Sequence, residues 1–254
     1  MTSRGHLAVR IAVGVPLAFL AVLAVEGALA SRREYFETPG YEVEGTIDPP
    51  GAVGDPVEMV MLGDSTVAGL GADTLEESLV LQTAQRAADL AGRPIHARGF
   101  GVSGAVTADV RDEQFPRVSD DVDVIVIVIG SNDTTHLTPP WKMDDLTASM
   151  LATARRQAPN AAIVLGGIPL FGEARALDEP LRSVVDGYAS VLRGVQRRVA
   201  ESTDGVTFVN IAVEASPRFV GVPDAMSRDQ FHPGAVGYGF WADALAPAVA
   251  AAIT

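Results

Sequence analysis

The sequence predicts an α/β protein in which a parallel sheet of five strands lies between two layers of helices, a three-layer sandwich. Short apolar runs alternate along the chain with longer segments of helical periodicity. The strongest run, residues 122–129, is β-branched and has no polar alternation after Asp123, which is typical of a strand covered on both faces. Strands that alternate with helices favour parallel pairing through crossover helices.

The elements follow in order from local signals. The first apolar run ends at Gly63, and Gly92 with Pro94 stops the helix after it. The expected strands cover residues 57–62, 95–100, 122–129, 161–165 and 206–211. The expected helices cover residues 75–90, 143–157, 177–195 and 235–253.

The N-terminus, residues 1–30, predicts a signal peptide or a membrane anchor. Arg4 and Arg10 precede an apolar run over residues 11–25, and Ala28-Leu29-Ala30 has the small-x-small spacing of a signal peptidase site. The run over residues 11–25 is shorter than the about 20 residues that span a bilayer core. Cleavage and membrane attachment through residues 11–30 therefore both stay open. Either outcome places the protein outside the cytoplasm.

The next stretch, residues 31–55, is rich in proline, glycine and acidic residues and is expected to be an extracytoplasmic linker. Residues 56–254 then form one globular domain. The pattern shows neither an internal repeat nor a low-complexity tract.

Charge and composition exclude several functions. The formal net charge is −13, and residues 1–30 contribute +1 of it, so the remainder carries −14. Such a surface repels phosphate backbones, so we expect no nucleic-acid partner, and a polyanionic substrate such as acyl-CoA is disfavoured. The chain has no cysteine, which excludes disulfides, cysteine-ligated zinc and a thiol nucleophile.

Two motifs carry candidate chemistry. Gly63-Asp64-Ser65-Thr66 follows the first strand, where a serine hydroxyl would be exposed at the sheet edge. Asp229 and His232 precede the last helix, and such a pair could place one imidazole nitrogen on Ser65 and the other on a carboxylate. Each motif alone is also compatible with an ordinary turn or helix cap.

Two further motifs end other strands. In Gly130-Ser131-Asn132-Asp133, the amide of Asn132 could donate a hydrogen bond to a developing oxyanion. In Gly101-Val102-Ser103-Gly104, a glycine allows a backbone N–H to approach a ligand closely.

Together, the four motifs resemble the SGNH hydrolase (GDSL-type esterase and lipase) family, which is named for Ser, Gly, Asn and His in four blocks. Ser65, Gly104, Asn132 and His232 follow the family's order over residues 57–250. Thr66 stands where many members have leucine, and Gly99 and Gly101 are close alternatives to Gly104.

The resemblance implies a flavodoxin-like fold and a serine esterase. Ser65 would attack an acyl carbonyl, His232 would act as base and then acid, and Asp229 would orient it. The Ser65 and Gly104 amides and the Asn132 side chain would hold the oxyanion. An acyl-enzyme would follow, with no cofactor and no metal, and the substrate would be a small or lipid-like acyl ester.

Other functions stay open at this stage. The same triad could transfer an acyl group to, or deacetylate, a glycan or lipid, and the fold could serve as a non-catalytic binding module. The run Gly99 to Gly104 also matches a dinucleotide-binding fingerprint, although it follows the second strand and not the first. The acyl length, the alcohol and the oligomeric state cannot be read from the sequence.

A few other side chains could belong to a site. His136 could line the pocket but is more typical of a solvated loop, and His96 is expected to be structural. Trp141 and Phe171 follow prolines and could form the rim of an acyl pocket.

Overall fold

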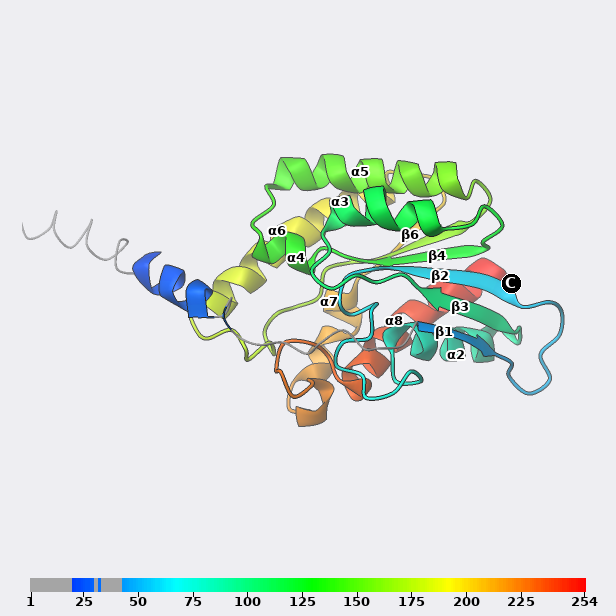
Figure 1. The fold of residues 1–254 in the computed structure, drawn as a ribbon, viewed down its shortest axis with the longest axis horizontal. Coiled ribbons are helices and arrows are strands. Elements are labelled where there is room, and N and C mark those ends of the chain that lie inside the picture. Colours follow the sequence, from blue (N-terminus) through cyan, green and yellow to red (C-terminus); the bar gives the residue numbers. More distant parts are fainter. Residues whose placement is uncertain (1–19, 30–31, 33–42) are drawn as a thin grey trace, which may run out of the picture.

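The sheet lies between two helical layers (Figure 1), in a computed structural model that describes residues 20–29, 32 and 43–254. Helices α3, α4, α5 and α6 cover one face, and α2 and α8 cover the other. The strands are β1 (Val43–Ile47), β2 (Val57–Gly63), β3 (Ile95–Gly99), β4 (Val124–Val128), β5 (Ala162–Gly166) and β6 (Val206–Val209). The α-helices are α2 (Leu79–Ala91), α3 (Thr107–Asp109), α4 (Ser131–Thr135), α5 (Pro140–Gln157), α6 (Leu181–Glu201), α7 (Ile211–Glu214) and α8 (Ala235–Ile253).

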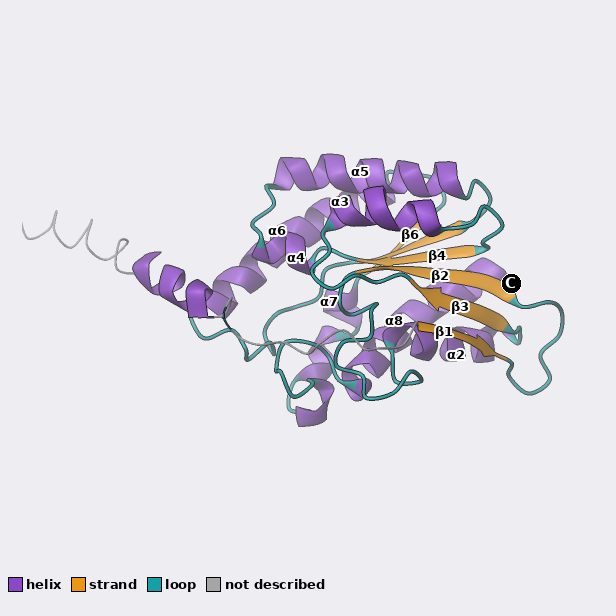
Figure 2. Cartoon of the chain, in the orientation of Figure 1, coloured by secondary structure: helices purple, strands orange, loops and turns teal. Residues whose placement is uncertain are grey.

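The strand order is β1-β3-β2-β4-β5-β6, and every neighbouring pair except β1–β3 is parallel (Figure 2). The predicted parallel five-stranded sheet is therefore confirmed, but the total of five strands is wrong. The sixth strand, β1, comes from the stretch that was expected to be a linker. Its alternation is weak because Gly45 occupies an inward position between Val43 and Ile47, so the sequence shows no continuous apolar period.

Alternate residues of the central strands feed two separate hydrophobic cores. In β2, Met59 and Met61 pack toward α2 and α8, whereas Val60 and Leu62 pack toward α5 and α6. The side chains of β4 alternate between the same two cores, which explains why this strand is apolar at every position. Both faces of these strands are therefore covered, as expected from the sequence.

Several helix boundaries differ from the sequence expectation for local reasons. Helix α2 begins at Leu79 because the side chain of Ser78 caps it, accepting a hydrogen bond from the backbone N–H of Leu81 at 3.3 Å. Helix α5 begins earlier than expected, with Pro140 in its first turn. Helix α6 begins after Pro180, so Leu177 lies in the preceding loop.

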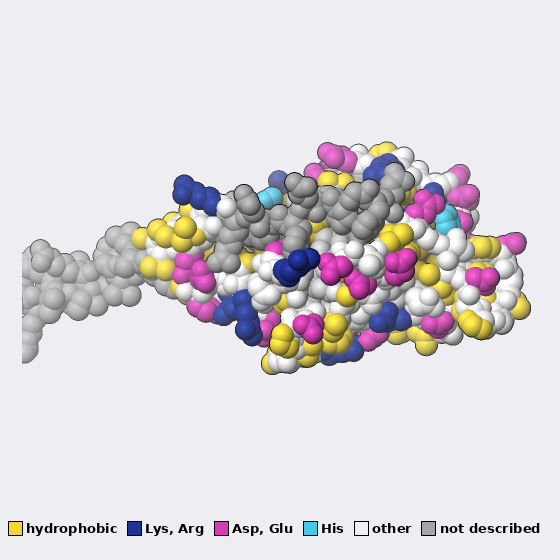
Figure 3. Space-filling model, turned by 60° about the horizontal axis from the view of Figure 1, so that its bottom comes forward, with side chains coloured by type: hydrophobic (Ala, Val, Ile, Leu, Met, Phe, Trp, Pro, Cys, Tyr) yellow, Lys and Arg dark blue, Asp and Glu magenta, His cyan; other side chains and the backbone are white. Residues whose placement is uncertain are grey.

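The expected signal or anchor segment lies largely outside the described residues. Within the described part of the chain, a short apolar helix covers Leu20–Leu29, and its hydrophobic side chains gather at the left of Figure 3. A carboxylate oxygen of Glu26 in this helix accepts a hydrogen bond from the backbone N–H of Leu181, at 3.0 Å. Among the described helices, Ala235–Ile253 is the one that is long and apolar enough to cross a membrane, but 61% of its apolar 18-residue window is buried in the protein as α8.

The chain order creates a crevice at one edge of the sheet. The loop after β2 leads to α2 on one face, whereas the loop after the adjacent strand β4 leads to α5 on the other face. Connections that diverge in this way leave a gap at the carboxyl ends of the two strands, where ligands bind in open α/β sheets. Ser65 lies on the first of these two diverging connections, and Asn132 lies on the second, in the first turn of α4.

Candidate active site

Ser65 lies on the tight turn that follows β2. The carboxylate of Asp64 holds this turn by accepting hydrogen bonds from the backbone N–H of Thr66 at 3.0 Å and from its hydroxyl at 2.8 Å. The loop after β3 packs directly against it, since a Cβ at Gly101 would lie 2.2 Å from the backbone nitrogen of Ala68. Ser65 is only 7% exposed, so its hydroxyl is fixed in a nearly enclosed position.

His232 connects the serine to a carboxylate. Its Nε2 lies 2.9 Å from the Oγ of Ser65, and its Nδ1 lies 2.6 Å from Oδ2 of Asp229. The other oxygen of Asp229 accepts hydrogen bonds from the backbone N–H groups of Phe231 and His232, both at 2.9 Å. These contacts fix the ring between the serine hydroxyl and the carboxylate.

The loop around Asp229 has an unusual backbone that makes this arrangement possible. Gln230 has a φ of 57°, in the left-handed region that non-glycine residues rarely adopt. The hydroxyl of Ser227 also donates to Oδ1 of Asp229, at 2.7 Å. The carboxylate is thus surrounded by donors from its own loop, and the sequence spacing alone did not reveal this.

The surroundings shift the pKa values of two carboxyl groups in opposite directions. Burial acts to raise the pKa of Asp229, but the hydrogen bonds from the His232 ring and from the two backbone amides outweigh it and lower this pKa to about 2. Burial raises the pKa of Asp64, and the hydrogen bonds from Thr66 only partly oppose that effect. Asp229 is therefore the carboxylate that is ionised beside the imidazole at neutral pH.

Asn132, from the first turn of α4, lines the same cavity as Ser65 and His232. Its side-chain nitrogen donates to the backbone oxygen of Ala105 at 2.9 Å, which fixes the amide and leaves its second N–H for a ligand. Gly104 lies on the exposed loop nearby with a φ of 82°, a conformation that favours glycine. Gly104 is not among the residues that line the cavity, so its place in an oxyanion site stays a prediction.

Buried glutamines that the sequence analysis did not single out hold the strand ends of the site. The side chain of Gln114 donates to the backbone oxygen of Gly63 and accepts from its N–H, at 2.8 and 2.9 Å. Gln196 similarly joins the backbone of Ile129 to that of Ile168. These bonds satisfy backbone groups that parallel strands leave unpaired where they separate.

Asp133 is buried next to Asn132, and the sequence analysis gave it no separate role. It accepts hydrogen bonds from the N–H and the hydroxyl of Thr107 and from the hydroxyl of Thr138. It therefore ties α3 and the loop after α4 together and keeps Asn132 in place.

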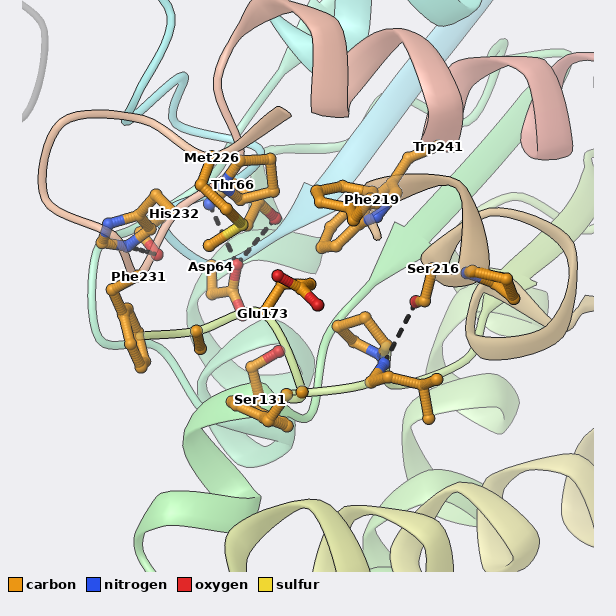
Figure 4. A pocket seen from close by; sticks show the side chains of 18 of the residues that line it. Asp64, Thr66, Ser131, Glu173, Ser216, Phe219, Met226, Phe231, His232 and Trp241 are labelled. Carbon is orange, nitrogen blue, oxygen red and sulfur yellow. Dashed lines mark hydrogen bonds between the residues drawn. The ribbon is translucent and has the colours of Figure 1, made fainter. Parts of the chain in front are cut away.

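The cavity beside Ser65 has a volume of about 290 Å³ and is mainly apolar (Figure 4). Phe171 belongs to its wall, as the sequence suggested, whereas Trp141 is 73% exposed and His136 is exposed, and neither lines it. The wall also contains residues that the sequence analysis did not identify. They include Leu170, Glu173, Ser216, Phe219, Val220, Met226, Phe231 and Trp241.

His96, on β3, is partly exposed to solvent and does not line this cavity. Its ring nitrogens contact Glu58 and Glu44, both at 2.9 Å, and join three strands. Across the described part of the chain, no cluster of three or more histidine, aspartate or glutamate side chains could hold a metal ion.

Comparisons with known proteins identify a family for this chain. The model of the GDSL-like lipase/acylhydrolase family matches residues 61–240. The GDSL-like esterase Rv1075c of Mycobacterium tuberculosis is 30% identical over 202 residues, which are 78% of this chain and 63% of that protein. This chain therefore spans a little under two thirds of that relative's length.

Solved structures share the fold at lower identity. A phospholipase A1 from Streptomyces albidoflavus NA297 aligns with a TM-score of 0.55 and 22% identity, over 75% of this chain and 98% of that one. An acetyl xylan esterase from Geobacillus stearothermophilus aligns with a TM-score of 0.55 and 17% identity, over 78% of this chain and 96% of that one. With the family model covering most of the domain, this chain belongs to the GDSL-like lipase/acylhydrolase family.

Proposed function

We propose that the protein is a serine esterase that hydrolyses carboxylic esters through Ser65, His232 and Asp229. The observation that carries the proposal is the continuous chain of contacts from the Ser65 hydroxyl through the His232 ring to the Asp229 carboxylate, at 2.9 and 2.6 Å. Ser65 and His232 line an apolar cavity, and the chain belongs to a lipase and acylhydrolase family. A serine with this environment is an activated nucleophile.

The first half of the proposed reaction forms an acyl-enzyme. Oγ of Ser65 attacks the carbonyl carbon while its proton passes to Nε2 of His232, and the ionised Asp229 stabilises the resulting imidazolium. The carbonyl oxygen becomes an oxyanion that the amide of Asn132 and the backbone N–H groups of Ser65 and Gly104 stabilise. The imidazolium then protonates the alcohol oxygen as the bond between carbon and that oxygen breaks.

The second half releases the acid. Nε2 of His232 takes a proton from a water molecule, whose oxygen attacks the acyl carbon. The second oxyanion collapses, the bond to Oγ breaks, and the serine recovers its proton from His232. An alcohol in place of water would give acyl transfer, so the nature of the acceptor distinguishes an esterase from a transferase that has the same triad.

The cavity limits the acyl or alcohol group that fits beside the serine. Its volume of about 290 Å³ is at the small end of ligand pockets. The fold itself does not select the alcohol, because a phospholipase A1 and an acetyl xylan esterase share it. We therefore propose short to medium acyl esters as substrates.

A rate profile with p-nitrophenyl esters from acetate to palmitate tests the proposal. We expect turnover with the shorter esters, and loss of it in Ser65→Ala. Product analysis in the presence of a sugar or glycerol acceptor separates hydrolysis from transfer. Wild-type protein that releases no acid from any ester, or a Ser65→Ala variant as active as wild type, would reject the proposal.

We further propose that the domain acts outside the cytoplasm, attached or delivered by residues 11–30. The support is the preceding Arg4 and Arg10, the apolar run, and the apolar helix at Leu20–Leu29. The N-terminal sequence of the native protein should begin at Ser31, or the intact chain should be recovered with the membrane fraction. Full-length protein in the cytosol would contradict this.

A further inference from the structure

A carboxylate projects into the mainly apolar cavity beside Ser65. Glu173, on the loop after β5, lines this cavity, and its side chain is 27% exposed. Figure 4 shows its carboxylate directed into the space between Ser131 and Phe219. Apolar walls screen a charge less than open water does. A charged group on a bound ester therefore interacts with this carboxylate more strongly than it would with a carboxylate on the open surface.

The loop that carries Glu173 is attached on both sides of that residue. On one side, the backbone N–H of Phe171 donates to Oδ1 of Asp186, in α6, at 2.7 Å. On the other side, the backbone N–H of Ala176 donates to the backbone oxygen of Gln230 at 3.0 Å. Gln230 belongs to the loop of the proposed catalytic histidine, so these bonds hold the loop of Glu173 next to the loop of the triad.

The wall contains no permanent positive charge that would balance this carboxylate. Among the described residues that line the cavity, the acidic and basic ones are Asp64, Glu173 and His232, and none is a lysine or an arginine. His232 is neutral when it acts as a base. Oε2 of Glu173 pairs at 3.2 Å with Arg175, but the side chain of Arg175 is 66% exposed and is not part of the lining. A pair with so exposed a partner is weak, so the cavity keeps a negative potential.

We propose that Glu173 makes this cavity select esters by charge: an ester that carries an ammonium group is preferred to a neutral ester of the same shape, and an ester that carries a carboxylate is the poorest substrate. The carboxylate of Glu173 attracts the ammonium group and repels a second carboxylate. The same repulsion acts on the acid that hydrolysis releases, and it favours departure of that product. The inference rests on the proposed esterase function and specifies its substrate.

The charged group can belong to the alcohol part or to the acyl part of the ester, and two series of matched substrates distinguish the two. The alcohol series is acetylcholine, 3,3-dimethylbutyl acetate and 3-acetoxypropanoate. The acyl series consists of the p-nitrophenyl esters of 4-(trimethylammonio)butyrate, 5,5-dimethylhexanoate and glutarate. In each series the cation comes first, its neutral carbon analogue second and the anion third. In one series we expect kcat/KM to fall by about tenfold at each step, the effect of a partly screened charge in the cavity.

The matched variants are Glu173→Gln, which removes the charge and keeps the shape, and Glu201→Gln, which makes the same change of net charge at the exposed end of α6. Glu173→Gln should reduce each step to about twofold or less. Glu201→Gln should leave the steps unchanged, and Arg175→Gln should keep or widen them. Two results would overturn the proposal: a wild type that shows no order by charge in either series, or steps that Glu173→Gln leaves intact.

A binding measurement separates this inference from the esterase function itself. Ser65→Ala protein is titrated in a calorimeter with two pairs of esters, acetylcholine with 3,3-dimethylbutyl acetate, and the ethyl esters of 4-(trimethylammonio)butyrate and 5,5-dimethylhexanoate. For one pair we expect the cation to bind about tenfold more tightly, and the difference to disappear when Glu173→Gln is added to the same chain. If the wild type hydrolyses no ester, the proposed function fails, while this titration still decides the inference. Equal affinities within both pairs would reject it.

Discussion

Within the described residues, two histidines contact carboxylates, and one of these two also faces a serine hydroxyl. His232 is buried, with Nδ1 at 2.6 Å from Asp229 and Nε2 at 2.9 Å from the hydroxyl of Ser65. One nitrogen therefore donates to a carboxylate, and the other can accept the serine proton.

His96, a partly exposed residue of β3, has a different arrangement. Both of its ring nitrogens contact carboxylates, Glu58 on β2 and Glu44 on β1, and all three side chains are partly exposed to solvent. Neither ring nitrogen of His96 therefore faces a hydroxyl group from which it could take a proton. The comparison teaches that the partner of the second nitrogen, and not the presence of a carboxylate, distinguishes a candidate base from a structural link.

The largest expected effect is at the buried pair. Ser65→Ala and His232→Ala should each reduce kcat by about 10³-fold or more, and the double variant should be scarcely worse than either, because the two groups act in one proton transfer. Steady-state kinetics with p-nitrophenyl acetate measures this. Losses that multiply in the double variant would show that the two residues act independently.

The next effect concerns the fixed amide beside the serine. Asn132→Ala should lower kcat by about 10²-fold with little change in KM, because the amide meets a charge that develops only in the transition state. The same assay gives both constants. A change confined to KM would make Asn132 a substrate-binding residue.

The carboxylate beside His232 should also affect stability with pH. The folded-state pKa of Asp229 is lowered to about 2 from an ordinary value near 3.8. Its ionised carboxylate therefore stabilises the fold at pH values above about 3.8. The contribution, at most about 2 kcal/mol, is lost as the pH falls toward the folded pKa. Urea unfolding of wild type and Asp229→Asn should therefore show a stability gap at pH 6 that narrows by pH 3. A gap of constant size would contradict the assignment of this pKa.

The smallest effect is expected at the exposed histidine. His96→Ala should keep kcat/KM within about twofold of wild type and change the free energy of unfolding by about 1 kcal/mol or less, because partly exposed ion pairs contribute little. Ester hydrolysis and urea unfolding on one preparation check both. A loss of activity comparable to that of His232→Ala would remove the distinction between the two histidines.

Much of the fold followed from local sequence patterns. The five parallel strands and the four long helices were predicted because apolar runs and helical periodicity are local signals. Strand β1 was missed because its alternation includes Gly45, and its pairing with β3 is a tertiary contact. The short helices α3, α4 and α7 are too brief to show a period.

The site was predicted in part for similar reasons. Ser65 and His232 are 167 residues apart in the sequence, and their side chains are in contact in the structure. The sequence analysis expected this contact because it placed both residues in loops at the carboxyl ends of the strands. Glu173 and Trp241 were missed because their place in the cavity depends on the packing of the loop after β5 against α8. In the sequence, Trp241 looks like any apolar residue of a core helix.

The assignment of the nucleophile can be tested by covalent labelling. The protein is incubated with a serine-directed fluorophosphonate, and the site of the adduct is located by peptide mass spectrometry, with His232→Ala as a parallel sample. We expect one adduct, on Ser65, that accumulates in step with the loss of ester hydrolysis and forms far more slowly in His232→Ala. An adduct on a different residue, or complete inactivation with Ser65 unmodified, would contradict the proposed catalytic role of Ser65.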